Sequence, residues 1–87
     1  MKQMTLLGSI VKELEFEDDY YSSLLMITND REQELEIMIF FPEEIGEKII
    51  EHFEMGMYVL ISASFEFRTN EEDLSLFLIV NDFNIIG

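Results

Sequence analysis

The chain has 87 residues and a mass of 10.3 kDa, a size that supports one hydrophobic core, so we expect a single domain over residues 1–87. Hydrophobic residues make up 48% of the chain, which excludes a disordered acidic polypeptide in spite of a formal net charge of −14. The lack of cysteine excludes disulfides, thiolate metal sites and a cysteine nucleophile, and no apolar run approaches the roughly 18 residues of a membrane span.

The first predicted strand is long and acidic toward its end. Residues 4–16 alternate between apolar and polar side chains in two phases, and the phase changes at Gly8, which predicts one strand bent near that glycine. The acidic cluster at residues 17–19 predicts a turn. Residues 20–28 are rich in strand formers on both faces and predict a second strand, followed by a turn at residues 29–31.

A third strand is predicted at residues 33–41, where apolar and polar side chains alternate plainly. One side carries Leu35, Ile37, Ile39 and Phe41, and the other carries Glu34, Glu36, Met38 and Phe40. The three strands follow one another with short turns, so we expect a meander.

The apolar period then changes from two to nearly four, which predicts a helix. Pro42 suits the first helical position, and Ile45, Ile49 and Phe53 recur at four-residue steps. We expect one helix of about three turns.

Two further strands are predicted after Gly56, which suits the end of a helix. Residues 57–67 alternate again, residues 69–73 form a polar turn, and residues 74–86 form a last long apolar strand. The side chains expected to point inward from the fourth strand are Val59, Ile61, Ala63, Phe65 and Phe67.

This order of elements predicts an all-β fold with one helix. Three meandering strands, a helix and a terminal hairpin match the five-stranded Greek-key barrel called the OB-fold, with the helix between strands three and four. In that fold the helix plugs one end of the barrel, so we expect Ile45, Ile49 and Phe53 to face that end.

Short motifs in a fixed order link the chain to a known family. They are Thr5-Leu6-Leu7-Gly8, Phe40-Phe41-Pro42 leading into the helix, the run from Phe53 to Val59, and Ile85-Ile86-Gly87. With these motifs the chain resembles the core of bacterial single-stranded DNA-binding proteins and primosomal replication proteins over nearly its whole length. The resemblance implies an OB-fold, a role in DNA metabolism and pairing of two barrels through their first strands, that is, a homodimer.

The resemblance also implies a nucleic-acid site, because family members stack bases on outward aromatic side chains and contact phosphates with lysine and arginine. The matching positions here are Phe40, Met38, Tyr20, Tyr21 and Arg68. The chain departs from the family where it has no tryptophan and where Glu34, Glu36 and Glu66 stand at positions that are often aromatic or basic. Packing of the aromatic side chains in the barrel remains an alternative interpretation.

Acidic residues form a second candidate site. The carboxylates predicted on solvent faces are those of Glu13, Glu15, Glu17, Asp18, Asp19, Glu34 and Glu36. A solvated face is one interpretation, because outward strand positions must be polar. The other is an anionic surface that mimics nucleic acid or receives a basic protein partner.

Nothing in the chain predicts catalysis, a cofactor or a metal site. The only histidine, His52, falls away from the apolar stripe of the predicted helix, so we expect it in solvent. No glycine-rich phosphate loop, nucleophile elbow, histidine pair or calcium-loop spacing is present. We therefore expect no enzymatic activity.

Two functional interpretations remain. The first is a non-enzymatic OB-fold module of DNA metabolism, similar to single-stranded DNA-binding proteins, that binds single-stranded nucleic acid weakly or locally, because five lysines and arginines neutralise few phosphates. The alternative is an acidic adaptor for protein–protein interaction, or a DNA mimic. The start of the chain lacks the pattern of a signal peptide, so we expect a cytoplasmic protein.

Overall fold

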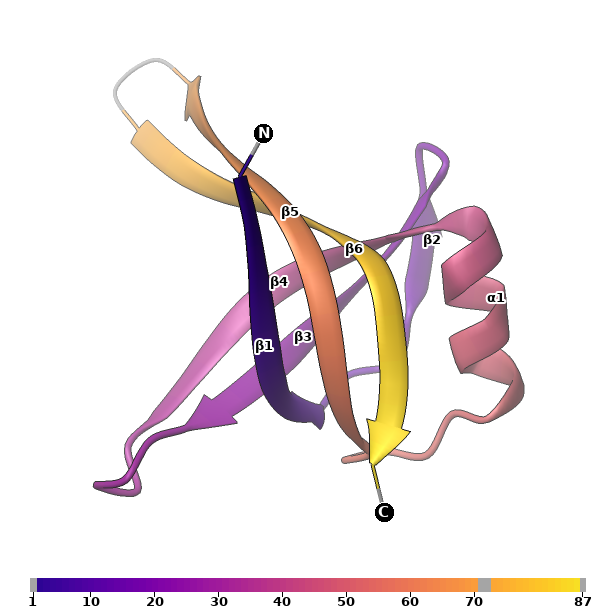
Figure 1. Cartoon of the computed structure of the whole chain (residues 1–87). Coiled ribbons are helices and arrows are strands. Elements are labelled where there is room, and N and C mark those ends of the chain that lie inside the picture. The colour runs from indigo at the N-terminus through magenta and orange to yellow at the C-terminus, as the bar shows by residue number, and fades with distance from the viewer. Residues whose placement is uncertain (1, 71–72, 87) are drawn as a thin grey trace.

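The computed structural model describes residues 2–70 and 73–86, without the side chains of residues 68, 70 and 73–75. Six strands and one helix make up this part of the chain (Figure 1). They are β1 (Lys2–Ile10), β2 (Glu15–Glu17), β3 (Tyr20–Thr28), β4 (Glu34–Pro42), α1 (Glu43–Glu51), β5 (Tyr58–Asn70) and β6 (Asp73–Ile86).

Five of the strands close into a barrel. The sheet runs in the order β1-β5-β6-β4-β3-β2, and β1 also pairs with β3, which closes the barrel and leaves β2 as an extra strand beside β3. That closing contact is short, because it pairs Ser9 with Met26 and Ile10 with Leu25. β4 and β6 run parallel where Phe40 pairs with Ile79, and the other neighbours are antiparallel. This is the predicted OB-fold, with the helix after the third strand of the barrel.

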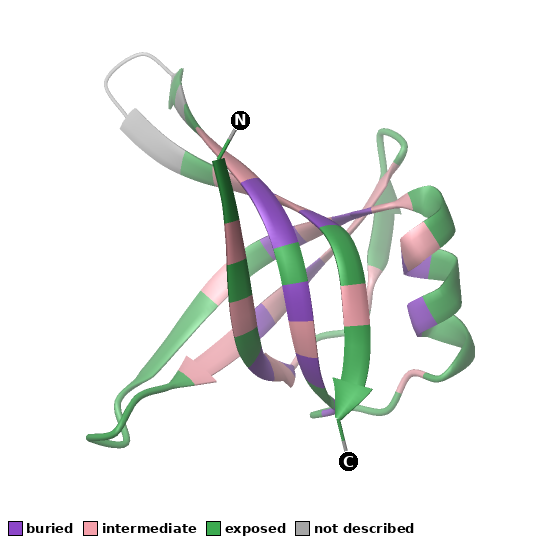
Figure 2. Ribbon diagram, viewed as in Figure 1, coloured by how far each residue is buried: buried purple, intermediate pink, exposed green. Residues whose placement is uncertain are grey.

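The inward side chains of the barrel strands and one face of the helix form the core. Their alternation with exposed side chains along each strand is visible in Figure 2 as bands of purple and green. The fully buried hydrophobic residues are Ile10, Leu25, Ile39, Phe41, Ile49, Val59, Ile61, Ala63, Leu78 and Val80.

The helix covers one end of the barrel, as predicted. Ile49 is completely buried, and Ile45 packs against the core from the same face of the helix. Phe53 also packs against the core, but it lies in the segment that follows the end of the helix at Glu51. The helix lies so close to β3 that a Cβ atom on Gly46 would collide with the ring of Tyr21. Glycine at this position therefore allows the helix to approach the sheet.

The prediction of one long strand over residues 4–16 is wrong, because β1 ends at Ile10 and β2 is a separate strand. Near its end β1 leaves β5 for β3, and at Gly8 it passes so close to β3 that a Cβ atom would lie 2.5 Å from the carbonyl oxygen of Met26. The buried Ser23 then holds the irregular segment, since its Oγ donates a hydrogen bond of 2.5 Å to the carbonyl oxygen of Lys12. Closing the barrel therefore breaks the strand.

The β5–β6 hairpin continues beyond the barrel wall and projects from the body of the molecule in Figure 1. Phe67 lies on this extension and is 64% exposed, so its predicted inward position is wrong. Its ring contacts Phe65 edge to face, with centroids 6.3 Å apart. Phe67 has the inward phase of the strand, but at that point there is no opposite wall to bury it.

Candidate functional site

Aromatic side chains from three strands gather on the outer face of the barrel. Cross-strand pairing places Tyr20 opposite Pro42, and Ser22 opposite Phe40, with Phe77 contributed by β6. The centroids of the Phe40 and Phe77 rings lie 4.5 Å apart, and the Tyr20 ring meets Phe77 edge to face at 6.3 Å. All three rings are half-buried, so each keeps part of its surface in contact with solvent.

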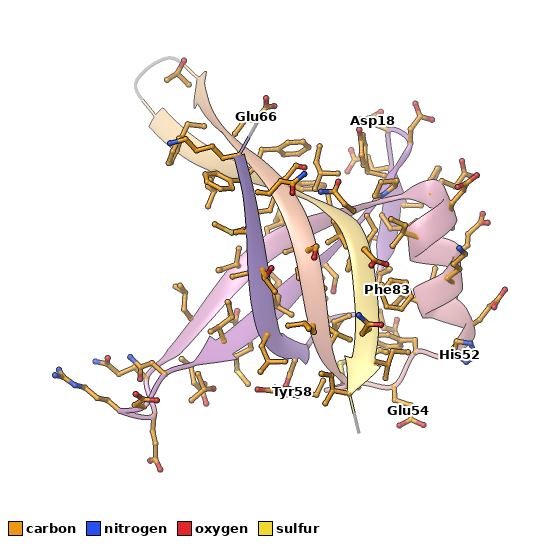
Figure 3. The ribbon with its side chains drawn as sticks, viewed as in Figure 1. Asp18, His52, Glu54, Tyr58, Glu66 and Phe83 are labelled. Atoms are coloured by element: carbon orange, nitrogen blue, oxygen red, sulfur yellow. The ribbon has the colours of Figure 1, made fainter. Side chains whose placement is uncertain are left out.

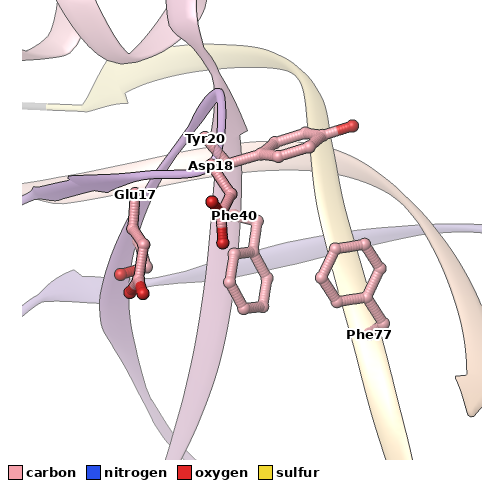
Figure 4. A pocket seen from close by; sticks show the side chains of 6 residues that line it. Glu17, Asp18, Tyr20, Phe40 and Phe77 are labelled. Atoms are coloured by element: carbon pink, nitrogen blue, oxygen red, sulfur yellow. The ribbon is translucent and has the colours of Figure 1, made fainter.

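These rings line a hollow of about 300 Å³, which we call the aromatic hollow (Figure 4). The residues that line it are Glu17, Asp18, Tyr20, Ser22, Phe40 and Phe77. The exposed face of an aromatic ring in such a hollow can stack a planar group, such as a nucleobase or a guanidinium.

Sequence reasoning missed Phe77, although a signal was present. Leu78 and Val80 are buried, so their side chains point into the barrel. Because side chains alternate along a strand, Phe77 and Ile79 lie on the outer face of β6. The unbroken apolar run of residues 76–80 hid this phase.

The other predicted nucleic-acid residues fall at different distances from the hollow. Met38 lies on the same face of β4 as Phe40 and is 54% exposed, but it does not line the hollow. Tyr21 faces the other side of β3, where its ring meets Phe16 with centroids 4.8 Å apart and lies against the helix. The backbone of Arg68 pairs with Ser75, and its side chain lies outside the described part of the structure.

The structure brings most of the acidic candidates to the same face as the aromatic hollow. Glu17 pairs with Tyr20 across the β2–β3 hairpin, and Glu15 pairs with Ser22, so both glutamates share the outer face with the rings. Asp18 follows in the turn and lines the hollow. The two sites predicted separately, one aromatic and one acidic, therefore meet.

Farther along β4 the same outer face becomes acidic again. Glu34 pairs with Thr28, Glu36 pairs with Met26, and both glutamates are exposed. Asp19 is exposed in the β2–β3 turn. Glu13 lies elsewhere, in a second hollow beside Leu14, Ile50 and Phe53.

Among the residues described, no lysine or arginine lines the aromatic hollow. Lys12 forms an ion pair with Glu15, with 3.6 Å between Nζ and Oε1, and both side chains are more than half exposed. Solvent and salt screen an exposed ion pair of this kind, so it offsets little of the negative potential of this face.

His52 is exposed at the C-terminal end of α1, as predicted, and Figure 3 shows it far from Asp18 at the tip of the β2–β3 turn. No group of three or more histidine, aspartate or glutamate side chains in the described residues is arranged to hold a metal ion. The described helix is too short to cross a membrane.

Comparison with solved structures shows the same fold in single-stranded DNA-binding proteins. The mitochondrial single-stranded DNA-binding protein Rim1 of S. cerevisiae is similar with a TM-score of 0.88 and 20% identity, over 97% of this chain and 92% of that chain. A dimeric structure of the N-terminal domain of PriB from Thermoanaerobacter tencongensis gives 0.75 and 18%, over 98% and 96%.

A single-stranded DNA-binding protein from Thermus aquaticus matches with a TM-score of 0.70 and 14% identity, over 100% of this chain and 51% of that chain. No family model and no curated protein matches the sequence. These structural similarities establish the OB-fold shared with single-stranded DNA-binding proteins.

Proposed function

We propose that the chain is a non-enzymatic OB-fold module of DNA metabolism that binds single-stranded DNA weakly, by stacking bases on Tyr20, Phe40 and Phe77. The observation that carries this proposal is the meeting of three outward rings from β3, β4 and β6 on the face of a fold shared with single-stranded DNA-binding proteins. Each base stacked on an aromatic side chain contributes roughly 1–3 kcal/mol to the binding free energy, whichever base it is.

The affinity should be low because the electrostatic contribution is small or adverse. Nonspecific DNA binding depends mainly on lysines and arginines that neutralise phosphates and release counterions. This chain has five such residues against nineteen acidic ones, and two carboxylates line the hollow itself. We therefore expect binding that depends on stacking and is confined to a few nucleotides.

The test is fluorescence anisotropy with a labelled oligothymidine at low salt. Phe40→Ala should weaken binding about tenfold, because the loss of one stacking platform removes roughly 1–3 kcal/mol. Arg68→Gln should also weaken binding, because it removes the predicted phosphate contact. Phe67→Ala is the matched control, since Phe67 is an exposed ring away from the hollow.

Thermal unfolding of each variant separates a lost contact from a lost fold, because Phe40 also packs on Phe77. Equal affinity of the Phe40→Ala variant and the unaltered chain for the oligothymidine would rule out stacking at this site. If the unaltered chain does not bind oligothymidine at low salt, the proposed function is ruled out.

We also propose that two copies pair through β1. Within the described chain this strand pairs with β5 along Lys2–Ser9 but with β3 only at Ser9 and Ile10, so the second edge of its first part is open. The adjoining outer surface is apolar at Leu7, Tyr58 and Ile86, each at least 43% exposed. Open strand edges next to apolar surface are sites of chain pairing, and the PriB structure with this fold is a dimer.

A further inference from the structure

The carboxylates at the aromatic hollow point to a cationic ligand. Glu17 and Asp18 line the hollow together with the rings of Tyr20, Phe40 and Phe77, and Figure 4 shows both carboxylates beside the Phe40 ring. A phosphate placed there would meet two negative charges. A cation placed there would meet two carboxylates and the negative faces of aromatic rings, both of which attract it.

We propose that the aromatic hollow binds an arginine side chain from a basic, extended peptide segment of a protein partner, with Glu17 and Asp18 accepting hydrogen bonds from its guanidinium. Arginine fits better than lysine for a geometric reason. The guanidinium is planar, so it can stack on a ring while its N–H groups bind carboxylates at the edge, whereas the compact ammonium of lysine cannot stack.

The same face offers a second acidic position at a defined distance. Glu36 lies four residues from Phe40 on β4 and shares its face, a separation of about 13 Å along the strand. Between them, Met38 and the half-buried Leu24 present an apolar surface. An extended peptide covers the same distance with four residues, so its second basic side chain should follow the first at position i+4.

The charge of the whole molecule favours this ligand over a polyanion. A net charge of −14 on 87 residues attracts a basic segment over long range and speeds its association. Among the acidic residues, Glu15, Glu17, Asp18, Glu34 and Glu36 surround the outer face that carries the hollow. The inference goes beyond the proposed DNA binding, and the two ligands would compete for the same rings.

The experiment measures anisotropy of a labelled peptide containing Arg-Ser-Thr-Ser-Arg, beside the same peptide with citrulline or lysine in place of both arginines. We expect citrulline, which keeps the planar shape without the charge, to weaken binding at least about tenfold, and lysine to weaken it about threefold. Equal binding of the arginine and citrulline peptides would overturn the proposal, and so would the absence of binding by the arginine peptide.

Two pairs of variants locate the peptide. Glu17→Gln with Asp18→Asn should weaken it about tenfold, whereas Glu47→Gln with Glu51→Gln, an equal charge change on the exposed side of α1, should leave it within about twofold. Phe77→Leu should weaken it and Phe67→Leu should not, because only Phe77 lines the hollow. Equal losses within either pair would show nonspecific attraction and overturn the site.

Oligothymidine as a second probe separates this inference from the proposed DNA binding. The Glu17→Gln, Asp18→Asn variant should bind oligothymidine more tightly while it binds the peptide less tightly, since removal of the carboxylates eases phosphate repulsion. Peptide binding without DNA binding would support this inference and rule out the proposed function. DNA binding without peptide binding would support the proposed function and overturn this inference.

Discussion

At the scale of single residues, neighbouring side chains of the same chemistry have opposite roles. Phe41 is completely buried in the barrel, whereas Phe40 faces outward and lines the aromatic hollow. Tyr21 packs on the helix, and Tyr20 reaches the hollow. In each pair the strand alternation alone separates a core residue from a candidate binding residue.

The helix provides a direct test of burial at this scale. Ile49→Ala should lower the free energy of unfolding by about 2–5 kcal/mol, because it truncates a side chain with no exposed surface. The matched control is Ile50→Ala, the same substitution at the next position of the helix, where the side chain is 45% exposed. Urea unfolding of both variants measures the difference, and a loss for Ile49→Ala as small as for Ile50→Ala would contradict the packing of the helix on the barrel.

At the scale of elements, the short β2–β3 hairpin is the feature that shapes the site. Asp18 and Asp19 both have positive φ angles, 52° and 70°, which is the backbone of a tight two-residue hairpin turn. This turn folds β2 back along β3, and so it places Glu15 and Glu17 on the face that carries Tyr20. Without the break after β1, these glutamates would have continued along the first strand.

The turn backbone makes a stability prediction. Asp19→Gly should raise the free energy of unfolding by up to about 1 kcal/mol, because a left-handed backbone conformation costs an L-residue roughly 1–2 kcal/mol and the extra conformational entropy that glycine loses on folding offsets only part of this. Thermal and urea unfolding check the change. The control is Asp30→Gly, which removes the same charge from the β3–β4 turn at a residue without positive φ. If Asp30→Gly raises the free energy of unfolding by the same amount, the cause is relief of charge repulsion and not of backbone strain.

At the scale of the whole molecule, the net charge opposes the pairing of two copies that the apolar surface beside β1 favours. The open edge of β1 and its apolar surroundings favour pairing of two copies, but each copy carries a net charge of −14. Repulsion between like charges at an interface weakens association and is reduced by salt. The oligomeric state should therefore depend on ionic strength.

We expect the dimer to form more readily at 0.15 M salt, where the screening length is about 8 Å, than at 0.01 M, where it is about 30 Å. Sedimentation equilibrium should show a rise in average mass between these conditions. Leu7→Lys should prevent the rise, because it places a charge on the apolar surface beside the open edge. A mass that stays at 10.3 kDa at both salt concentrations would contradict the proposed pairing.

The sequence by itself determined the helix, the last four strands and the fold. A period of two at residues 33–41 and of nearly four after Pro42 distinguished strand from helix, and the order of elements matched one barrel topology. It also identified Phe40 and Tyr20 as candidates, because local alternation assigns a side chain to a face whatever the strand later pairs with.

Only the tertiary structure decided where the first strand breaks, which phase of β6 faces outward, and that the acidic and aromatic candidates share one face. Gly8 adjoins Met26, Glu17 adjoins Tyr20, and Phe77 adjoins Phe40 only once the barrel closes and the β2–β3 hairpin folds back. These contacts depend on strand order and register, and the contacts of Gly8 and Phe77 join residues far apart in the chain. Local periodicity assigns each side chain to a face of its strand, but it does not identify the residue that this side chain meets on another strand.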